Sequence, residues 1–274
     1  MNERERFPAI SDIGEALEAW AHPEWAESYD NVGLQVGDPS RRVQCGLMAL
    51  DCTPAILEEA ARIGAELIIT HHPLLFHPLR NVTPVTFPSN LALRLAEARI
   101  ALYSIHTNLD AAPGGVSIAL AQQLGLEEIR FLTLREDGEA AGLGAIGQCT
   151  APMPLRDLLR TVAERLSAPS LRYAGDLEAI IRTVAVCGGS GSAFTRDALR
   201  AGADAYVTAD VTYHKFFDVL NNGGKPRMAL IDAGHYETEV HAEELVRQWL
   251  ANRFPEVSWQ RATSSTNPVR TFVP

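Results

Sequence analysis

Two adjacent histidines, His71 and His72, follow a run of mostly apolar and β-branched residues, Glu66–Thr70. Successive side chains of a strand point to opposite faces, so a histidine pair inside a strand would be hard to use as a unit. At the carboxyl end of a strand this constraint relaxes, and open α/β sheets bind ligands there. Pro73 keeps His72 extended. We therefore expect two imidazoles at the mouth of a sheet, each able to reach a different metal ion, although an incidental or structural role is the simpler interpretation of the pair alone.

Two later buried runs also end in a histidine with a carboxylate close behind it. Residues 100–105 are followed by His106 and Asp110, and residues 228–233 by His235 and Glu239. Residues four apart share one face of a helix, so His235 and Glu239 would form half of a metal site if a helix begins there. For Glu239 alone, an acidic residue favoured by the dipole of a helix N-terminus is an equally good interpretation.

Three imidazoles and two carboxylates thus form a candidate set of metal ligands: His71, His72, Asp110, His235 and Glu239. This set is too small for two closed four-coordinate sites unless ligands or waters bridge. It suits two ions about 3.5–4 Å apart that share a carboxylate and a hydroxide. Mixed nitrogen and oxygen ligation favours Zn, Mn, Fe, Co or Ni over Ca or Mg. Open coordination positions would suit catalysis.

Further residues could support such a centre, and each has a simpler alternative. Gly189, Ser190 and Gly191 lie in a strand-to-helix turn whose N–H groups could hold a phosphate, but a tight turn is the favoured interpretation. Asp210 and His214 could be a supporting group and a general base, or His214 could be a solvated helix position. Asp30 and Asn31 lie just before Gly33 and could belong to a pocket, but turn chemistry is the favoured interpretation of this pair.

The elements that must position these residues alternate between strand and helix. This alternation predicts an α/β protein with mostly parallel sheets covered by helices. A proline-rich loop, residues 73–88, is too polar and broken for core structure, and long loops of this kind are often functional.

The second half of the chain echoes the first. The sequence Arg62–Thr70 matches Arg200–Thr208 at an offset of 138 residues, and the same offset superposes the preceding strand and helix. We expect two similar α/β domains, residues 1–130 and 131–274, related by a pseudo-twofold axis with a metal cleft between them. The C-terminal strand could return to the first half.

Composition narrows the classes of function. The chain has 274 residues, 46% of them hydrophobic, and a formal net charge of −10, which argues against a large nucleic-acid interface. No transmembrane segment or signal peptide is apparent, so we expect a cytoplasmic protein without a membrane partner. The four cysteines show no C-x-x-C spacing, so neither a disulfide nor a thiolate metal site is expected.

Six short motifs, taken in order, resemble the YbgI-type dinuclear metal-binding family, whose members are often named GTP cyclohydrolase 1 type 2 homologs. The resemblance runs from about residue 10 to the C-terminus, and the motifs are Asp30–Gly37, Ile69–Leu75, His106–Asp110, Cys187–Gly191, Gly234–Glu239 and Thr266–Pro268.

This resemblance implies two similar α/β domains, a dinuclear metal centre in the cleft and a ring-shaped (toroidal) homohexamer. It assigns the ligands named above by motif position, with Glu239 as the bridge. Some relatives carry an inserted middle domain, for which this chain is too short. Cys52 stands where the family pattern suggests a β-branched apolar residue.

The leading hypothesis is a metal-dependent hydrolase, of the cyclohydrolase type by resemblance only. A metal-bound hydroxide would attack a nucleotide-like or phosphorylated small molecule, with His106 or His214 moving protons. The rival hypothesis is a non-catalytic metal-binding ring with a regulatory or scaffold role. Single-stranded nucleic-acid binding fits poorly with the negative charge.

Overall fold

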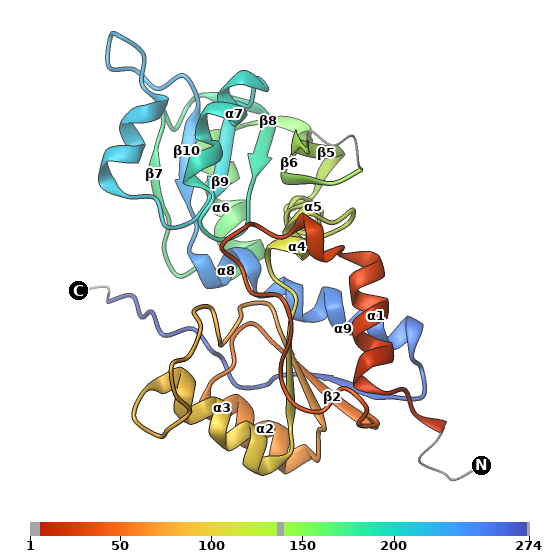
Figure 1. Ribbon diagram of the computed structural model, residues 1–274. Helices are drawn as coiled ribbons and strands as arrows, with labels where there is room; N and C mark the ends of the chain where they lie inside the picture. The colour runs from red at the N-terminus through yellow and green to blue at the C-terminus, as the bar shows by residue number, and fades with distance from the viewer. Residues whose placement is uncertain (1–5, 136–139, 273–274) are drawn as a thin grey trace. The chain divides into compact units, whose positions relative to one another are not determined.

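The computed structural model describes residues 6–135 and 140–272 of the chain. It divides into two compact units, Met1–Leu109 with Ala242–Pro268, and Asp110–His241 with Val269–Pro274. Each unit is built around one sheet (Figure 1). The division falls at residue 109 and not near residue 130, because α5 (Val116–Gln123) and β5 (Leu126–Leu134) belong to the second unit. The C-terminal segment returns to the first unit, where it pairs with the first sheet. Among the described residues, no helix has the length and apolar character needed to cross a membrane.

The first unit has a five-stranded sheet in the order β1-β4-β3-β2-β11. Its strands are β1 (Gly33–Val36), β2 (Cys45–Ala49), β3 (Leu67–Thr70), β4 (Ala101–Ser104) and β11 (Ser258–Arg261). Its helices are α1 (Ile10–Trp20), η2 (Pro23–Trp25), α2 (Pro54–Ile63), α3 (Phe87–Ala98) and α9 (His241–Arg253). All pairings are parallel except that of the edge strand β1 with β4.

Successive side chains of a strand point to opposite faces, and nearly every residue of β2, β3 and β4 is buried. Both faces of this sheet are therefore covered. Leu47, Ile68 and Leu102 pack against α2 and α3, which lie side by side in Figure 1. On the other face, Tyr103 donates a hydrogen bond to Glu18 of α1 at 3.1 Å. α1 and α9 meet through stacked tryptophan rings, Trp20 and Trp249, 4.9 Å apart.

The second unit has a six-stranded sheet in the order β5-β6-β8-β9-β10-β7. Its strands are β5 (Leu126–Leu134), β6 (Gly142–Pro154), β7 (Arg172–Ala174), β8 (Ile180–Val186), β9 (Ala205–Thr208) and β10 (Ala229–Asp232). Its helices are α5 (Val116–Gln123), α6 (Leu155–Leu166), η3 (Ser192–Phe194), α7 (Thr195–Arg200), η4 (Tyr213–Val219) and α8 (His235–Glu239), and α4 (Thr107–Ala111) links the units.

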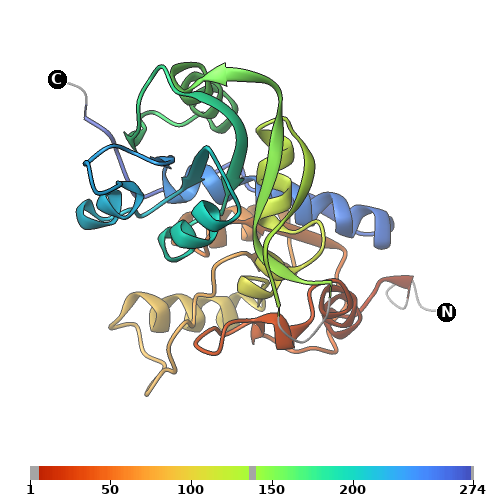
Figure 2. The same cartoon turned by 90° about the horizontal axis from the view of Figure 1, so that it is seen from above.

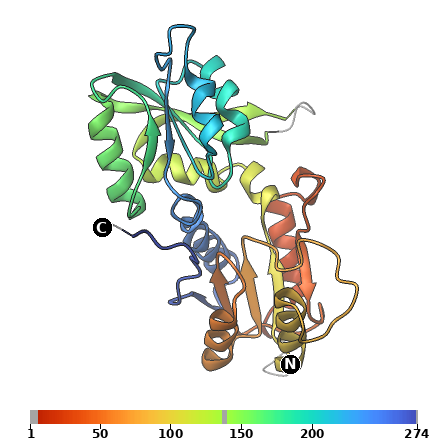
Figure 3. The same ribbon diagram turned by 90° about the vertical axis from the view of Figure 1, so that its left-hand side faces the viewer.

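The expectation of mostly parallel strands is wrong for this second sheet. Only β8, β9 and β10 run parallel, and β5, β6 and β7 pair antiparallel with their neighbours. β5 and β6 form a long paired ribbon (Figure 2), since a connection too short for a crossover helix forces antiparallel pairing. Figure 3 shows α6 on one side of this sheet and α7 on the other, in keeping with two separate apolar clusters.

The internal repeat is visible in local detail. Glu66, just before β3, accepts hydrogen bonds at 3.0 Å from the backbone N–H groups of Gln44 and Cys45. Asp204, just before β9, accepts equivalent bonds at 2.8 and 3.0 Å from Arg182 and Thr183, each 138 residues further along. Each carboxylate therefore bonds the two residues just before a parallel strand pairing begins, at Gly46 with Leu67 and at Val184 with Ala205.

Candidate metal centre

His71 and His72 stand directly beyond the carboxyl end of β3, which finishes at Thr70. Their backbone N–H groups donate to the carbonyls of Ala49 and Leu50 at 3.3 and 3.0 Å. The Thr70 hydroxyl donates to the His72 carbonyl at 2.8 Å. The main chain that carries the two imidazoles is therefore fixed by the sheet itself.

A third histidine, His106, comes from the end of the adjacent strand β4. One nitrogen each of His71, His72 and His106 lie within 4.8 Å of one another. Their ring centroids are between 5.1 and 5.4 Å apart. We call these three residues the histidine cluster.

Each ring of the histidine cluster has an oxygen beside its Nδ1 atom. The Nδ1–oxygen distances are 2.9 Å from His71 to the Ile105 carbonyl, 2.7 Å from His72 to Asp51 and 2.8 Å from His106 to Asp30. An oxygen acceptor places the proton on Nδ1 and leaves the lone pair on Nε2, the arrangement found around metal-binding histidines. The donor chemistry of the cluster thus fits a divalent transition metal.

Asp30 is the most enclosed of these oxygen partners, with its side chain 0% exposed. Besides facing His106, it accepts hydrogen bonds from the Thr107 N–H at 3.1 Å and from the Thr107 hydroxyl. Burial alone would raise the pKa of the Asp30 carboxyl, but the bonds from His106 and Thr107 outweigh it and hold the pKa well below its usual range. Asp30 is therefore an ionised carboxylate that orients His106.

Asn31 and Gln35 hold the loop that follows the histidine pair. Asn31 Nδ2 donates to the Leu75 carbonyl at 2.6 Å, and Gln35 Oε1 accepts from the Leu75 N–H at 3.0 Å. Gln35 also donates to the Asn31 carbonyl at 2.8 Å. This clamp places the Phe76 ring 6.4 Å from that of His106. The motif around Asp30 is therefore more than a turn, and its Gln35 was not singled out from the sequence.

Asp51 was also missed, and it links His72 to the C-terminal segment. Its second oxygen accepts a hydrogen bond from the Thr266 hydroxyl at 2.8 Å. The chain Thr266–Asp51–His72 therefore sets the orientation of the His72 ring. Its position could have identified it, because Asp51 lies two residues beyond the end of β2, as His72 lies two residues beyond the end of the neighbouring strand β3.

In the second unit, His235 and Glu239 project from α8 and face each other, with Nε2 and Oε2 3.0 Å apart. Asp210 lies 2.7 Å from the Nδ1 atom of His235. Asp210 adopts a left-handed conformation with φ of 53°, which is uncommon outside glycine and typical of functional sites. His235 thus has the same oxygen-anchored Nδ1 as the three cluster histidines.

The glycine-rich turn after β8 packs beneath this pair. The N–H groups of Gly188, Gly189 and Gly191 donate to the hydroxyls of Ser117, Thr238 and Thr208 at 3.3, 3.0 and 3.0 Å. These donors are engaged within the protein, which favours the tight-turn interpretation over phosphate binding by Gly189, Ser190 and Gly191. A Cβ atom on Gly189 would collide with Glu239 Oε1 and lie 3.2 Å from the His235 ring.

Asp110 lies on α4. Its carboxylate and that of Glu239 both interact electrostatically with the buried thiol of Cys187. Burial raises the pKa of the Cys187 thiol to about 12, and the nearby charges of Asp110 and Glu239 contribute. A thiol held protonated in this way is a poor metal ligand, so the carboxylates and imidazoles are the better candidate donors of this region.

His214 stands apart from these groups. It is exposed on η4, and its ring contacts Tyr213 at a centroid distance of 5.3 Å. Asp210, four residues earlier, bonds His235 instead. This position favours the solvated-helix alternative over a role in proton transfer.

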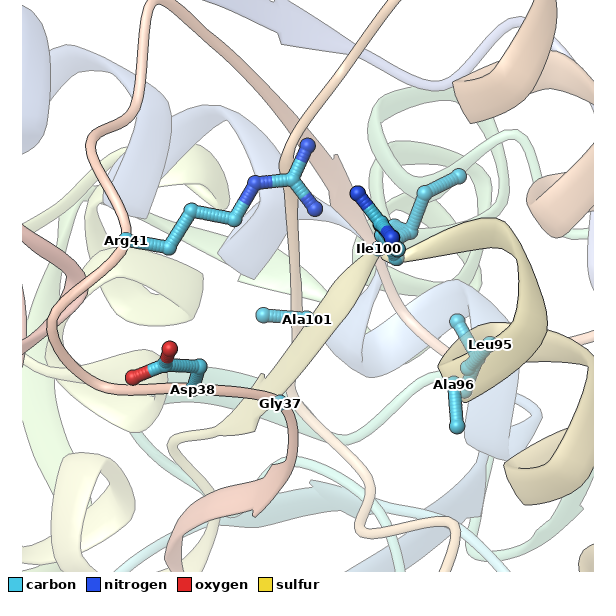
Figure 4. A pocket seen from close by; sticks show the side chains of 8 residues that line it. Gly37, Asp38, Arg41, Leu95, Ala96, Ile100 and Ala101 are labelled. Carbon is cyan, nitrogen blue, oxygen red and sulfur yellow. The ribbon is translucent and has the colours of Figure 1, made fainter.

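A separate cavity of about 650 Å³ opens at the other end of the first sheet (Figure 4). Arg41, Asp38 and Ala101 are among the residues that line it. Ala101 begins β4 whereas His106 follows its end, so this cavity is remote from the histidine cluster.

Comparison with protein families finds one match over nearly the whole chain. The family described as Duf34/NIF3 (NGG1p interacting factor 3) matches residues 8–268. A Streptomyces coelicolor protein named GTP cyclohydrolase 1 type 2 homolog is 40% identical over 237 residues, covering 85% of this chain and 82% of that protein. A Clostridium perfringens protein of the same name is 36% identical over 230 residues, covering 84% and 86%.

Solved structures show the same fold. The Staphylococcus aureus hypothetical protein SA1388 superposes with a TM-score of 0.88 at 28% identity, covering 96% of this chain and 99% of that one. The protein ybgI, described as of unknown function, gives a TM-score of 0.80 at 25% identity, with 96% and 100% covered.

Proposed function

This chain belongs to the Duf34/NIF3 family, and on that premise we propose that it is a dinuclear metal-binding protein that works as a metal-dependent hydrolase. The observation that supports the proposal is the oxygen beside the Nδ1 atom of His71, His72 and His235, which would direct the Nε2 atoms of these three ligands toward metal ions. The proposed ligands are His71, His72, Asp110, His235 and Glu239, with Glu239 as the bridge between two ions.

The proposed ligands are divided between the two units: His71 and His72 belong to the first, and Asp110, His235 and Glu239 belong to the second. We propose that the two groups serve one centre, in a cleft between units related by a pseudo-twofold axis. Ions such as Zn, Mn, Fe, Co or Ni would supply a Lewis acid and lower the pKa of coordinated water.

His106 is the proposed proton carrier. Asp30 holds the proton at its Nδ1 atom, so the Nε2 atom remains to accept a proton from water or return it to a leaving group. The substrate class is a nucleotide-like small molecule, as the name of the curated relatives suggests.

The test is to load the protein with metal and measure turnover and metal content together. A panel of nucleotides, phosphate esters and cyclic amides should yield a substrate. His106→Ala should then lose turnover while keeping its metal, and the exposed His214→Ala serves as the matched control with both unchanged. If metal binds but no member of the panel is turned over, the rival account, a non-catalytic metal-binding ring, would be favoured.

We also propose a homohexamer, which light scattering would test.

A further inference from the structure

A cavity of about 300 Å³ lies beside His72 within the first unit. Its lining includes Pro73 and Leu74, which follow the histidine pair, and Phe87 at the start of α3. It also includes Thr266 and Pro268 of the C-terminal motif, which we call the C-terminal wall. The proline-rich loop and the C-terminal motif thus line one space next to a proposed metal ligand.

The C-terminal wall is held in place by two carboxylates. Glu59 of α2 accepts hydrogen bonds from the Thr263 and Ser264 N–H groups at 2.9 and 3.1 Å. Asp51 accepts from the Thr266 hydroxyl at 2.8 Å. These hydrogen bonds therefore hold residues 263–266 in place beside the cavity.

The lining is largely apolar and its polar atoms are engaged. Both oxygens of Asp51 are taken by His72 and Thr266, and the Thr53 hydroxyl accepts from the Ile56 N–H. Burial raises the pKa of the Cys52 thiol to about 12, so it lines the cavity as a small neutral group. Phe87, which also lines the cavity, is 56% exposed.

From this lining we infer that the cavity is the substrate pocket of the proposed metal centre and receives a planar aromatic or heteroaromatic ring. Its volume is at the lower end of the range for small-molecule sites, which suits one or two fused rings. A flat apolar ring matches walls made of phenyl, proline and leucine side chains. The inference rests on the proposed function, because the rest of the substrate would reach the metal beside His72.

Two hydroxamates, one with an aromatic ring and one without, provide the test. Acetohydroxamate and benzohydroxamate carry the same metal-binding group, but the first has a methyl group where the second has a phenyl ring. Calorimetry on zinc-loaded protein would give both dissociation constants. Benzohydroxamate should bind about tenfold more tightly, because its ring packs in the cavity. Phe87→Ala should remove most of this gain and leave acetohydroxamate binding and zinc content unchanged.

Phe76→Ala is the matched control. Phe76 is a second phenylalanine of the same loop, but its ring lies beside His106 and it is not among the residues that line the cavity. The inference is overturned if benzohydroxamate gains nothing over acetohydroxamate, or if Phe76→Ala rather than Phe87→Ala removes the gain. Binding of neither hydroxamate to zinc-loaded protein would overturn the inference together with the open metal centre. Binding of acetohydroxamate alone would overturn the pocket and leave the proposed function standing.

Discussion

The Nδ1 atom of His106 lies 2.8 Å from a buried oxygen of Asp30, 76 residues earlier in the chain. This pair ties the segment before β1 to the end of β4, and it orients a histidine that faces two others. The same pattern of an oxygen behind each imidazole recurs at His71, His72 and His235.

Replacing Asp30 by asparagine should destabilise the first unit by about 2 kcal/mol, because the buried carboxylate receives bonds from His106 and Thr107. Urea unfolding monitored by tryptophan fluorescence would measure the change. Asp38→Asn is the control, since Asp38 is exposed and its carboxylate accepts hydrogen bonds from Ser40 within its own turn. Equal midpoints for Asp30→Asn and wild type would contradict this account of Asp30.

Thr266→Val should weaken zinc binding about tenfold without unfolding the protein, because Asp51 would lose the hydroxyl that fixes it behind His72. Competition with a chromogenic chelator would measure the affinity. Thr266→Ser should restore it, and Ser265→Ala should have no effect, since the Ser265 hydroxyl accepts a hydrogen bond from the nearby Asn267 N–H and does not bond Asp51. Unchanged affinity in Thr266→Val would show that the orientation of His72 does not depend on the C-terminal segment.

Glu59 predicts a pH dependence of stability. Burial alone would raise the pKa of Glu59, but hydrogen bonds from Thr263 and Ser264 outweigh it and lower the pKa to about 2. A carboxyl with a pKa lower in the folded than in the unfolded state stabilises the fold above its unfolded pKa of 4.5, and this contribution is lost as pH falls toward 2.

Glu59→Gln should therefore lower the free energy of unfolding by about 2–3 kcal/mol at pH 7. The difference from wild type should shrink steadily in urea titrations between pH 5 and pH 3. Glu58→Gln on the same helix is the control, because Glu58 is exposed and forms only a 3.4 Å ion pair with Arg94. A pH-independent difference for Glu59→Gln would refute the charge-based explanation.

Gly189→Ala should reduce metal binding, since the new methyl group would displace Glu239 from His235. Gly202→Ala separates this effect from backbone strain. Both glycines have positive φ, 57° and 78°, but a Cβ atom at Gly202 meets no atom within 4 Å. Gly202→Ala should cost about 1 kcal/mol of stability and leave metal content unchanged. Equal metal content in the two variants would argue against a close-packed role for Gly189.

The α/β class and the ends of the strands could be predicted from the sequence, because runs of apolar residues mark β3, β4 and β10 and the histidines follow them directly. The roles of Asp51 and Gln35 could not, because each acts on a residue that is distant in sequence. Turn chemistry was the favoured explanation of Asp30 and Asn31 until their partners were known. The direction of β5, β6 and β7 depends on how the chain returns after each strand, which periodicity does not determine.

The most direct test of the dinuclear centre is the metal content per chain, by elemental analysis of protein purified without chelator or affinity tag. The wild type should carry close to two transition-metal ions, and His235→Ala should carry clearly fewer. His241→Ala is the matched control, because His241 lies six residues further on and bonds the Val116 carbonyl instead, so it should match the wild type. Near-zero metal in the wild type even after reconstitution would contradict the metal centre and the hydrolase proposal with it.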